Sequence, residues 1–338
     1  MTELLLKLTF IPGLEEIVLQ EIKHYPEFHI IEKRKDAFYL DIIDDLSTVL
    51  TLKSIIGVSI IRQGTELNPH FLSKHKSLLG EIVERVLSVT PESFRTMKFS
   101  CAGADSKEVK EIQTFVKDTY KVVSAEEADM EISIGKQSGV WEVGVRLTNR
   151  PLSLRSYKVA NIKGGLNPTI AYAMNVLAEL RDKKTYLNVF SGSATLLIEA
   201  GLTYTQLSLL GFDNNGKSIA LAVQNIKKAG LIKRIQLKNA DIREHPDLGT
   251  FDCIVSDLPF GMQIGKDEDL DALYRQFVAF CEDVLSPHGV LVVYTTEHEL
   301  LEGIFLQSRF TISQTLSLRV STVVNAYIYP KIFVCRLK

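Results

Sequence analysis

From Lys184 onward, strand-like and helix-like segments alternate along the chain, and this feature constrains the fold more than any other. Short apolar runs alternate with stretches of helical periodicity, at residues 186–190, 193–202, 208–213, 217–229, 235–239, 251–257, 269–285, 290–295 and 297–305. Such alternation predicts an α/β fold with a parallel sheet and helices on both faces. The segments at 310–320 and 325–337 lack an intervening helix, so we expect two antiparallel strands to close the sheet.

The part of the chain before Lys184 predicts two smaller α/β pieces and a linker. A chain of 338 residues exceeds the ~150 residues usual for one domain. Residues 1–62 show strand and helix patterns, and residues 63–158 continue with helices at 71–89 and 107–121. Asn167 and Pro168 suit the N-cap and first position of a helix at 169–180. We therefore expect domains at 1–62 and 63–158, a linker helix within 159–182, and a C-terminal domain at 183–338.

Composition excludes several classes of protein. The apolar runs are far shorter than the ~20 residues that a membrane-spanning helix needs. The four cysteines form no CxxC pair, and His70 and His75 are one residue too far apart to share a helix face, so we expect no metal site and no disulfide framework. We predict a cytoplasmic monomer without a membrane segment. The net charge of −2 gives no support for nucleic-acid binding, so any case for RNA must come from the site.

Three strand ends carry residues suited to a nucleoside-containing cofactor, because ligands of an open parallel sheet bind beyond the carboxyl ends of its strands. Small residues follow the first strand, where they let a ligand approach the backbone at a helix start. An acid after the second strand can accept both hydroxyls of a ribose, and the third strand offers an acid for an adenine amine and an apolar residue for its ring. The turn lacks the third glycine of GxGxxG, which argues against a nicotinamide cofactor. The predicted cofactor residues are Asn188, Phe190, Ser191, Gly192, Ala194, Asp213, Asn214, Asp241, Ile242 and Asp257.

The fourth strand ends in Asp257-Leu258-Pro259-Phe260-Gly261, the most specific feature of the sequence. An exocyclic base amine is a poor nucleophile and needs acceptors for its N–H bonds that leave the lone pair directed at a methyl group. Asp257 and the carbonyl of Leu258 can be those acceptors. Pro259 can fix the turn, and Phe260 can stack on an extruded base. The alternative is an ordinary strand-ending turn, in which Pro and Gly are common.

These motifs resemble those of the THUMP-domain RNA methyltransferases, especially those that form N2-methylguanosine in tRNA. The similarity includes FSGSAT at 190–195, DLPFG at 257–261, PGLE at 12–15, LSLRSY at 152–157 and LNPT at 166–169. The resemblance implies a Rossmann-like class I methyltransferase domain that uses S-adenosylmethionine and whose sheet has seven strands, the last one antiparallel. It also implies a ferredoxin-like domain at 1–62 and an RNA-binding THUMP domain at 63–158, with tRNA as partner and Asp257 as acceptor of the target amine.

The sequence departs from the family pattern at three positions of the cofactor turn. Asn188 stands where an acid is usual, Ser191 where cysteine is frequent, and Ala194 where glycine is frequent. Two alternatives therefore stay open besides guanine methylation in tRNA. The chain could methylate guanine in ribosomal RNA or the N6 of adenine in nucleic acid, or it could be an inactive RNA-binding module.

The segment that leads into the linker supplies weaker candidates for RNA contacts. These are Arg155, Tyr157, Lys158 and Lys163. An isolated Arg or Tyr is more often structural, so both interpretations are kept for Arg155 and Tyr157. The sequence does not reveal whether a small activating partner protein is needed.

Overall fold

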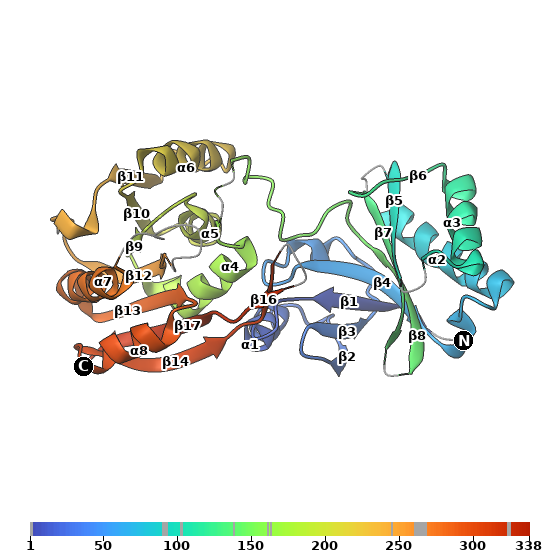
Figure 1. The fold of residues 1–338 in the computed structure, drawn as a ribbon, viewed down its shortest axis with the longest axis horizontal. Coiled ribbons are helices and arrows are strands. Elements are labelled where there is room, and N and C mark those ends of the chain that lie inside the picture. Colours follow the sequence, from blue (N-terminus) through green and yellow to red (C-terminus); the bar gives the residue numbers. More distant parts are fainter. Residues whose placement is uncertain are drawn as a thin grey trace. The chain divides into compact units, whose positions relative to one another are not determined.

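The computed structural model describes residues 3–89, 94–101, 104–137, 139–160, 162, 164–244, 246–259, 269–322 and 326–338. The chain divides into two compact units (Figure 1). Unit 1 comprises Met1–Phe10 and Val18–Ser153, and unit 2 comprises Ile11–Ile17 and Leu154–Lys338. Among the described residues, no helix combines the length and the apolar character that crossing a membrane requires.

Unit 1 is built on one eight-stranded sheet with the order β2-β3-β1-β4-β8-β7-β5-β6. Its strands are β1 (Leu5–Thr9), β2 (Ile30–Lys33), β3 (Ala37–Asp41), β4 (Gly57–Gln63), β5 (Thr96–Cys101), β6 (Val123–Ser124), β7 (Met130–Gln137) and β8 (Val140–Arg146). Strand β4 pairs antiparallel with both β1 and β8, so the two expected N-terminal domains share a continuous sheet. The predicted boundary after residue 62 lies inside β4. The division into ferredoxin-like and THUMP domains stays a prediction.

The main core of unit 1 packs helices against this sheet. The helical elements are α1 (Glu15–Ile22), η1 (Thr48–Thr51), η2 (Thr65–Leu67), α2 (Leu72–Val89) and α3 (Lys107–Tyr120), and the first turn of α1 groups with unit 2. Helix α3 begins where predicted because the Ser106 hydroxyl accepts a hydrogen bond from the Val109 amide. Leu8, Ile60 and Val143 of the sheet and Val83 of α2 are fully buried in one cluster.

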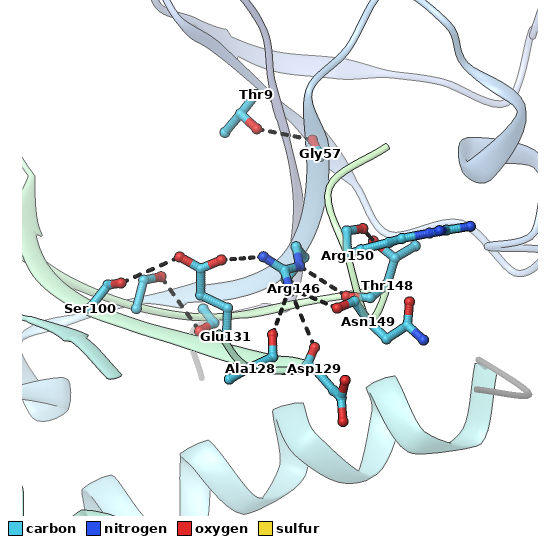
Figure 2. Close-up of polar contacts among 12 residues, drawn as sticks. Thr9, Gly57, Ser100, Ala128, Asp129, Glu131, Arg146, Thr148, Asn149 and Arg150 are labelled. Atoms are coloured by element: carbon cyan, nitrogen blue, oxygen red, sulfur yellow. Dashed lines mark hydrogen bonds and ion pairs between the residues drawn. The ribbon is translucent and has the colours of Figure 1, made fainter. Parts of the chain in front are cut away.

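Arg146 at the end of β8 fixes the chain that leaves unit 1 (Figure 2). Its guanidinium pairs with Glu131 of β7 and donates to the backbone carbonyls of Thr148 and Asn149, at 2.9 and 3.0 Å. It also donates to the carbonyl of Ala128, at 3.2 Å. Arg146 has a structural role, because its N–H groups donate hydrogen bonds to backbone carbonyls of the protein itself.

Unit 2 contains a seven-stranded sheet with the order β11-β10-β9-β12-β13-β17-β14. The strands are β9 (Thr185–Val189), β10 (Ser208–Asp213), β11 (Ile235–Asn239), β12 (Phe251–Asp257), β13 (Leu285–Thr295), β14 (Phe310–Ser317) and β17 (Lys331–Leu337). Strands β9 to β13 are parallel, and β17 pairs antiparallel with both β13 and β14. The predicted seven-stranded sheet with its last strand antiparallel is therefore confirmed, and the structure places that strand, β17, between β13 and β14.

Helices cover this sheet as its alternating pattern predicted (Figure 1). They are α4 (Pro168–Leu177), η3 (Leu180–Asp182), α5 (Thr195–Thr203), α6 (Gly216–Lys228), η4 (Ile242–Glu244), α7 (Leu270–Val284) and α8 (His298–Leu306). Asn167 caps α4 by accepting from the Thr169 amide at 2.8 Å, with Pro168 in the first turn. Phe277 and Phe280 of α7 are buried against Val293 and Phe333 in the main apolar cluster of the unit. Two short paired strands, β15 (Val320–Ser321) and β16 (Tyr327–Ile328), come after β14 and before β17 in the sequence.

The turn at Pro12-Gly13 belongs to unit 2 and contacts the end of β14. The carbonyl of Pro12 accepts a hydrogen bond from the Arg319 amide at 3.1 Å. Gly13 has a φ of 102°, and a Cβ atom at this position would lie 2.2 Å from the carbonyl oxygen of Ser317. Only glycine fits here, because the backbone is left-handed and the neighbouring chain approaches the Cα directly.

Candidate active site at the carboxyl ends of the parallel strands

The turn between β9 and α5 is built from alternating left-handed residues. Phe190, Gly192 and Ala194 have φ values of 56°, 49° and 62°. The turn is held by the Ser191 amide, which donates to the carbonyl of Phe212 at 3.0 Å. A bulky aromatic residue and a buried alanine in this region are conformationally costly, and such strain is concentrated at functional sites. The turn is therefore shaped by the surrounding structure rather than by local preference.

Asp213, at the end of β10, connects this turn to its neighbours. One carboxylate oxygen accepts from the Gly192 amide at 2.9 Å, and the other accepts from the Asn215 amide at 2.9 Å. The side chain of Asn214 donates to Asp241 at 3.3 Å. Four predicted cofactor residues, at the ends of three neighbouring strands, are therefore linked by direct hydrogen bonds.

Asp241 carries a basic partner that the sequence interpretation missed. The Arg243 guanidinium binds its carboxylate through both oxygens, with the shortest contact at 2.5 Å. These hydrogen bonds hold the pKa of Asp241 well below its ordinary value. Ile242, which stands between Asp241 and Arg243 in the sequence, is buried. The sequence shows that Asp241 and Arg243 are two residues apart, but the contact between their side chains depends on the geometry of the loop.

Asn188 is part of the sheet rather than of its surface. The side chain is buried, and its amide donates to the carbonyls of Val189 and Val255, at 3.0 and 2.9 Å. The side chain thereby braces β9 against β12 close to their carboxyl ends. Ser191 is also buried, and its hydroxyl has no hydrogen-bond partner within the described part of the chain.

Asp257 ends β12 beside the cofactor turn, because β12 and β9 are neighbours and the Val189 amide donates to the Ser256 hydroxyl at 3.3 Å. The residue keeps some exposed surface, whereas its Oδ1 atom is buried without a hydrogen-bond partner among the described residues. Burial raises the pKa of Asp257 to about 8, and the positive charge of Lys158 opposes this rise. A carboxyl group with this pKa exchanges its proton near neutral pH, as residues of functional sites often do.

The residues after Asp257 are held by the neighbouring strand and helix. The Leu258 amide donates to the carbonyl of Tyr294 at 3.0 Å. The hydroxyl of Tyr274 on α7 donates to the carbonyl of Pro259 at 2.9 Å and lies 2.8 Å from the Thr295 hydroxyl. Tyr274 thus binds the carbonyl of Pro259, not that of Leu258. Phe260 lies outside the described residues.

The four predicted RNA contacts all belong to unit 2. Tyr157 is buried, and its hydroxyl donates to Glu199 of α5 at 2.7 Å. Arg155 pairs with the same carboxylate at 3.2 Å. Lys158 donates to the carbonyl of Leu166 at 2.9 Å. Lys163 lies outside the described residues. These contacts give the first three residues structural partners, and RNA binding by the four stays a prediction.

Curated proteins similar to this chain are RNA methyltransferases. The chain is 31% identical over 156 residues to the U6 snRNA (guanine-N(2))-methyltransferase THUMPD2 of Mus musculus, covering 46% of this chain and 28% of the mouse protein. It is 32% identical over 195 residues to the tRNA (guanine(6)-N2)-methyltransferase of Thermus thermophilus, covering 57% of this chain and 56% of that protein. The chain therefore spans from about a quarter to little more than half of the length of these relatives.

Solved structures share the fold over the whole chain. TrmN from Thermus thermophilus superposes with a TM-score of 0.78 at 22% identity, covering 99% of this chain and all of that one. SMU.472, solved in complex with SAH, gives a TM-score of 0.75 at 13% identity and covers 100% of this chain and 99% of that one. The family described as "RMKL-like, methyltransferase domain" matches residues 155–324, slightly more than half of the sequence. The chain therefore belongs to the RMKL-like methyltransferase family.

Proposed function

We propose that this protein transfers a methyl group from S-adenosylmethionine to the N2 atom of a guanosine in RNA, with tRNA as the substrate. The observation that carries the proposal is Asp257, at the strand end next to the cofactor turn, whose buried Oδ1 atom has no hydrogen-bond partner among the residues that the structure describes. A buried carboxylate oxygen without a donor is costly unless a ligand supplies one. The N–H of a base amine is such a donor. The guanine-N2 activities of the similar proteins support the choice of atom.

The residues at the strand ends fit the cofactor. Each oxygen of Asp213 accepts one backbone N–H, which leaves acceptor capacity for ribose hydroxyls. The unpartnered hydroxyl of Ser191 provides a further polar contact close to Gly192. Asp241 and Ile242 are proposed to bind the adenine, with Arg243 fixing the carboxylate of Asp241. Asn188, Phe190, Ala194 and Asn214 complete the proposed cofactor site. When bound, S-adenosylmethionine supplies the activated methyl group.

Asp257 and Leu258 perform the chemistry that this chain contributes. Their side-chain and main-chain oxygens accept the two N–H bonds of the amine and so direct its lone pair along the line of attack. As the N–C bond forms and the S–C bond breaks, one N–H proton becomes acidic. Asp257 takes it, because its pKa of about 8 makes it a stronger base than an ordinary carboxylate. Pro259 holds the turn, and Phe260 is proposed to stack on the base.

The remaining features of the proposal concern partners and location. Unit 1 is proposed to hold the RNA. Weaker contacts are proposed for four residues of the segment that follows it in the sequence, Arg155, Tyr157, Lys158 and Lys163. We propose a monomer that acts in the cytoplasm. A small activating partner protein is also proposed. If it is required, the isolated chain will be inactive until the partner is added.

Labelled methyl transfer tests the proposal. The protein is incubated with S-adenosylmethionine carrying a labelled methyl group and with total tRNA or ribosomal RNA, and the RNA is digested to nucleosides. We expect label in N2-methylguanosine from tRNA, and a loss of at least about a hundredfold in rate for Asp257→Asn. Label only in methyladenosine would identify adenine as the target base. Label only in ribosomal RNA would identify ribosomal RNA as the substrate.

A binding measurement distinguishes an enzyme from an inactive RNA-binding module. Calorimetry should detect binding of S-adenosylmethionine to the unmodified protein and much weaker binding to Asp213→Ala. The absence of binding heat for the unmodified protein, together with retained RNA binding, would establish the inactive module instead.

A further inference from the structure

The hydroxyl of Tyr274 lies in a chain of hydrogen bonds that ends on the backbone of Pro259, two residues after Asp257. It is 2.9 Å from the Pro259 carbonyl oxygen and 2.8 Å from the hydroxyl oxygen of Thr295. The Thr295 hydroxyl in turn accepts a hydrogen bond from the Glu297 amide at 3.0 Å. Tyr274 and Thr295 are both fully buried. The chain therefore connects the start of α8 and the end of β13, through α7, with the loop that follows β12.

The direction of each hydrogen bond in this chain follows from the chemistry of the groups. A backbone carbonyl can only accept, so Tyr274 donates its single hydroxyl proton to Pro259. The oxygen of Tyr274 is then an acceptor, and the Thr295 hydroxyl donates to it. Burial raises the pKa of Tyr274, so its hydroxyl keeps the proton at neutral pH. Removal of either hydroxyl would leave a buried polar atom without its partner, which is unfavourable.

The peptide group between Leu258 and Pro259 is anchored on both sides. On the upstream side, the Leu258 amide donates to the carbonyl of Tyr294 at 3.0 Å. On the downstream side, Tyr274 holds the Pro259 carbonyl, and the proline ring fixes the φ angle that lies between the two anchors. The Leu258 carbonyl belongs to this peptide group, so both anchors determine its direction.

We propose that Tyr274 is a positioning residue of the methyl-transfer site: oriented by Thr295, it acts through Pro259 to direct the Leu258 carbonyl toward the target amine. The inference rests on the proposed function, which assigns one N–H bond of the amine to this carbonyl. An acceptor that points away from the amine leaves the lone pair off the line of attack. An error of about 1 Å in such positioning costs about a hundredfold in rate.

Substitution of Tyr274 by phenylalanine removes the hydroxyl and keeps the ring. Tyr274→Phe should lower kcat by about tenfold to a hundredfold, while the Kd for S-adenosylmethionine and the KM for RNA stay within about twofold of those of the unmodified protein. Thr295→Val should also lower kcat, whereas Thr295→Ser, which keeps the hydroxyl, should not. This threonine pair decides the question if Tyr274→Phe does not fold. An unchanged kcat in Tyr274→Phe would overturn the proposal.

The matched control is Tyr186→Phe. Tyr186 is also fully buried in unit 2, and its hydroxyl donates to the side chain of Asn175 in α4 at 2.8 Å. Tyr186→Phe and Tyr274→Phe should both lower the melting temperature, because each variant loses a buried hydrogen bond. Only Tyr274→Phe should lower kcat. An equal loss of kcat in the two variants would assign the effect to general destabilisation and reject the positioning role.

The carbonyl resonance of Pro259 tests the hydrogen-bond chain without substrate or cofactor. Carbonyl-carbon NMR of protein labelled at proline, with Pro259→Ala for assignment, should show this resonance moving upfield in Tyr274→Phe, because the carbonyl loses its donor. A resonance that does not move would show that the hydrogen bond is absent in solution and would overturn the proposal. If the resonance moves but the unmodified protein methylates no RNA, the proposed function is what fails, and the hydrogen-bond chain is upheld.

Discussion

At the residue scale, the site combines features that a sequence shows with features that it hides. Acids after parallel strands are visible as a pattern: Asp213 and Asp241 do lie at the ends of the neighbouring strands β10 and β11, and Asp257 lies at the end of β12, on the other side of β9. The salt bridge from Arg155 to Glu199 is invisible in the sequence, because its partners are 44 residues apart. The same holds for the hydrogen bond from Lys158 to the carbonyl of Leu166, which depends on how the segment folds. Residue type could be predicted, and electrostatic environment could not.

The left-handed Ala194 allows a test of the cofactor turn. Ala194→Val should destabilise the protein by about 2 kcal/mol or more, because a β-branched residue is poorly tolerated at positive φ and the site is fully buried. Ala194→Gly should stay within about 1 kcal/mol of the parent, since relief of backbone strain offsets the greater flexibility of the unfolded chain. Urea unfolding measures both. Equal losses for the two variants would show that side-chain volume, not backbone conformation, limits this position.

At the element scale, the regular C-terminal alternation was predictable and the N-terminal sheet was only partly so. Strand β4 was missed, because it lies in the middle of the eight-stranded sheet and both its faces are largely buried, so it lacks the polar alternation of an exposed strand. Strand β13 begins at Leu285, earlier than expected, since the polar stretch at 286–289 continues the extended backbone. Strands β9 and β12 are also largely buried on both faces, but their regular alternation with helices made them predictable.

Two glycines in unit 2 give a matched pair at this scale. Gly13→Ala should destabilise the unit by about 2 kcal/mol or more, because the new Cβ would meet the Ser317 carbonyl at 2.2 Å in a left-handed backbone. Gly303→Ala in α8 should stabilise it by about 0.5–1 kcal/mol, since nothing lies within 4 Å and alanine favours the helix. Thermal unfolding with a probe for unit 2 compares them. A neutral Gly13→Ala would mean that the turn does not pack on β14 in solution.

At the scale of the whole molecule, Asp257 links activity to stability. Burial on folding raises the pKa of Asp257 from its ordinary value of 3.8 to about 8, so the native state binds more protons than the unfolded state between these pH values. Stability contributed by this group is therefore lost as pH rises from about 4 to about 8, and the loss is complete above that. In the proposed reaction, this unfavourable burial is what makes the carboxylate of Asp257 a stronger base.

Replacement of Asp257 by asparagine should lower activity and raise stability. Asp257→Asn, neutral at every pH, should be more stable than the parent by about 1–3 kcal/mol at pH 8, and the difference should shrink toward pH 5. Denaturant unfolding at both pH values measures it, with Asp271→Asn on the exposed surface of α7 as the comparison. A difference that is constant with pH would contradict the burial of a titrating carboxylate.

The docking of Pro12-Gly13 on the end of β14 has a consequence for the order of folding. The carbonyl of Pro12 and the amide of Arg319 come from nearly opposite ends of the chain, yet they share a hydrogen bond inside unit 2. During synthesis on the ribosome, residues 11–17 emerge early and must wait for almost the entire polypeptide before their partner exists. We therefore expect this long-range contact to form late in folding, at a rate limited by the search of residues 11–17 for their partner.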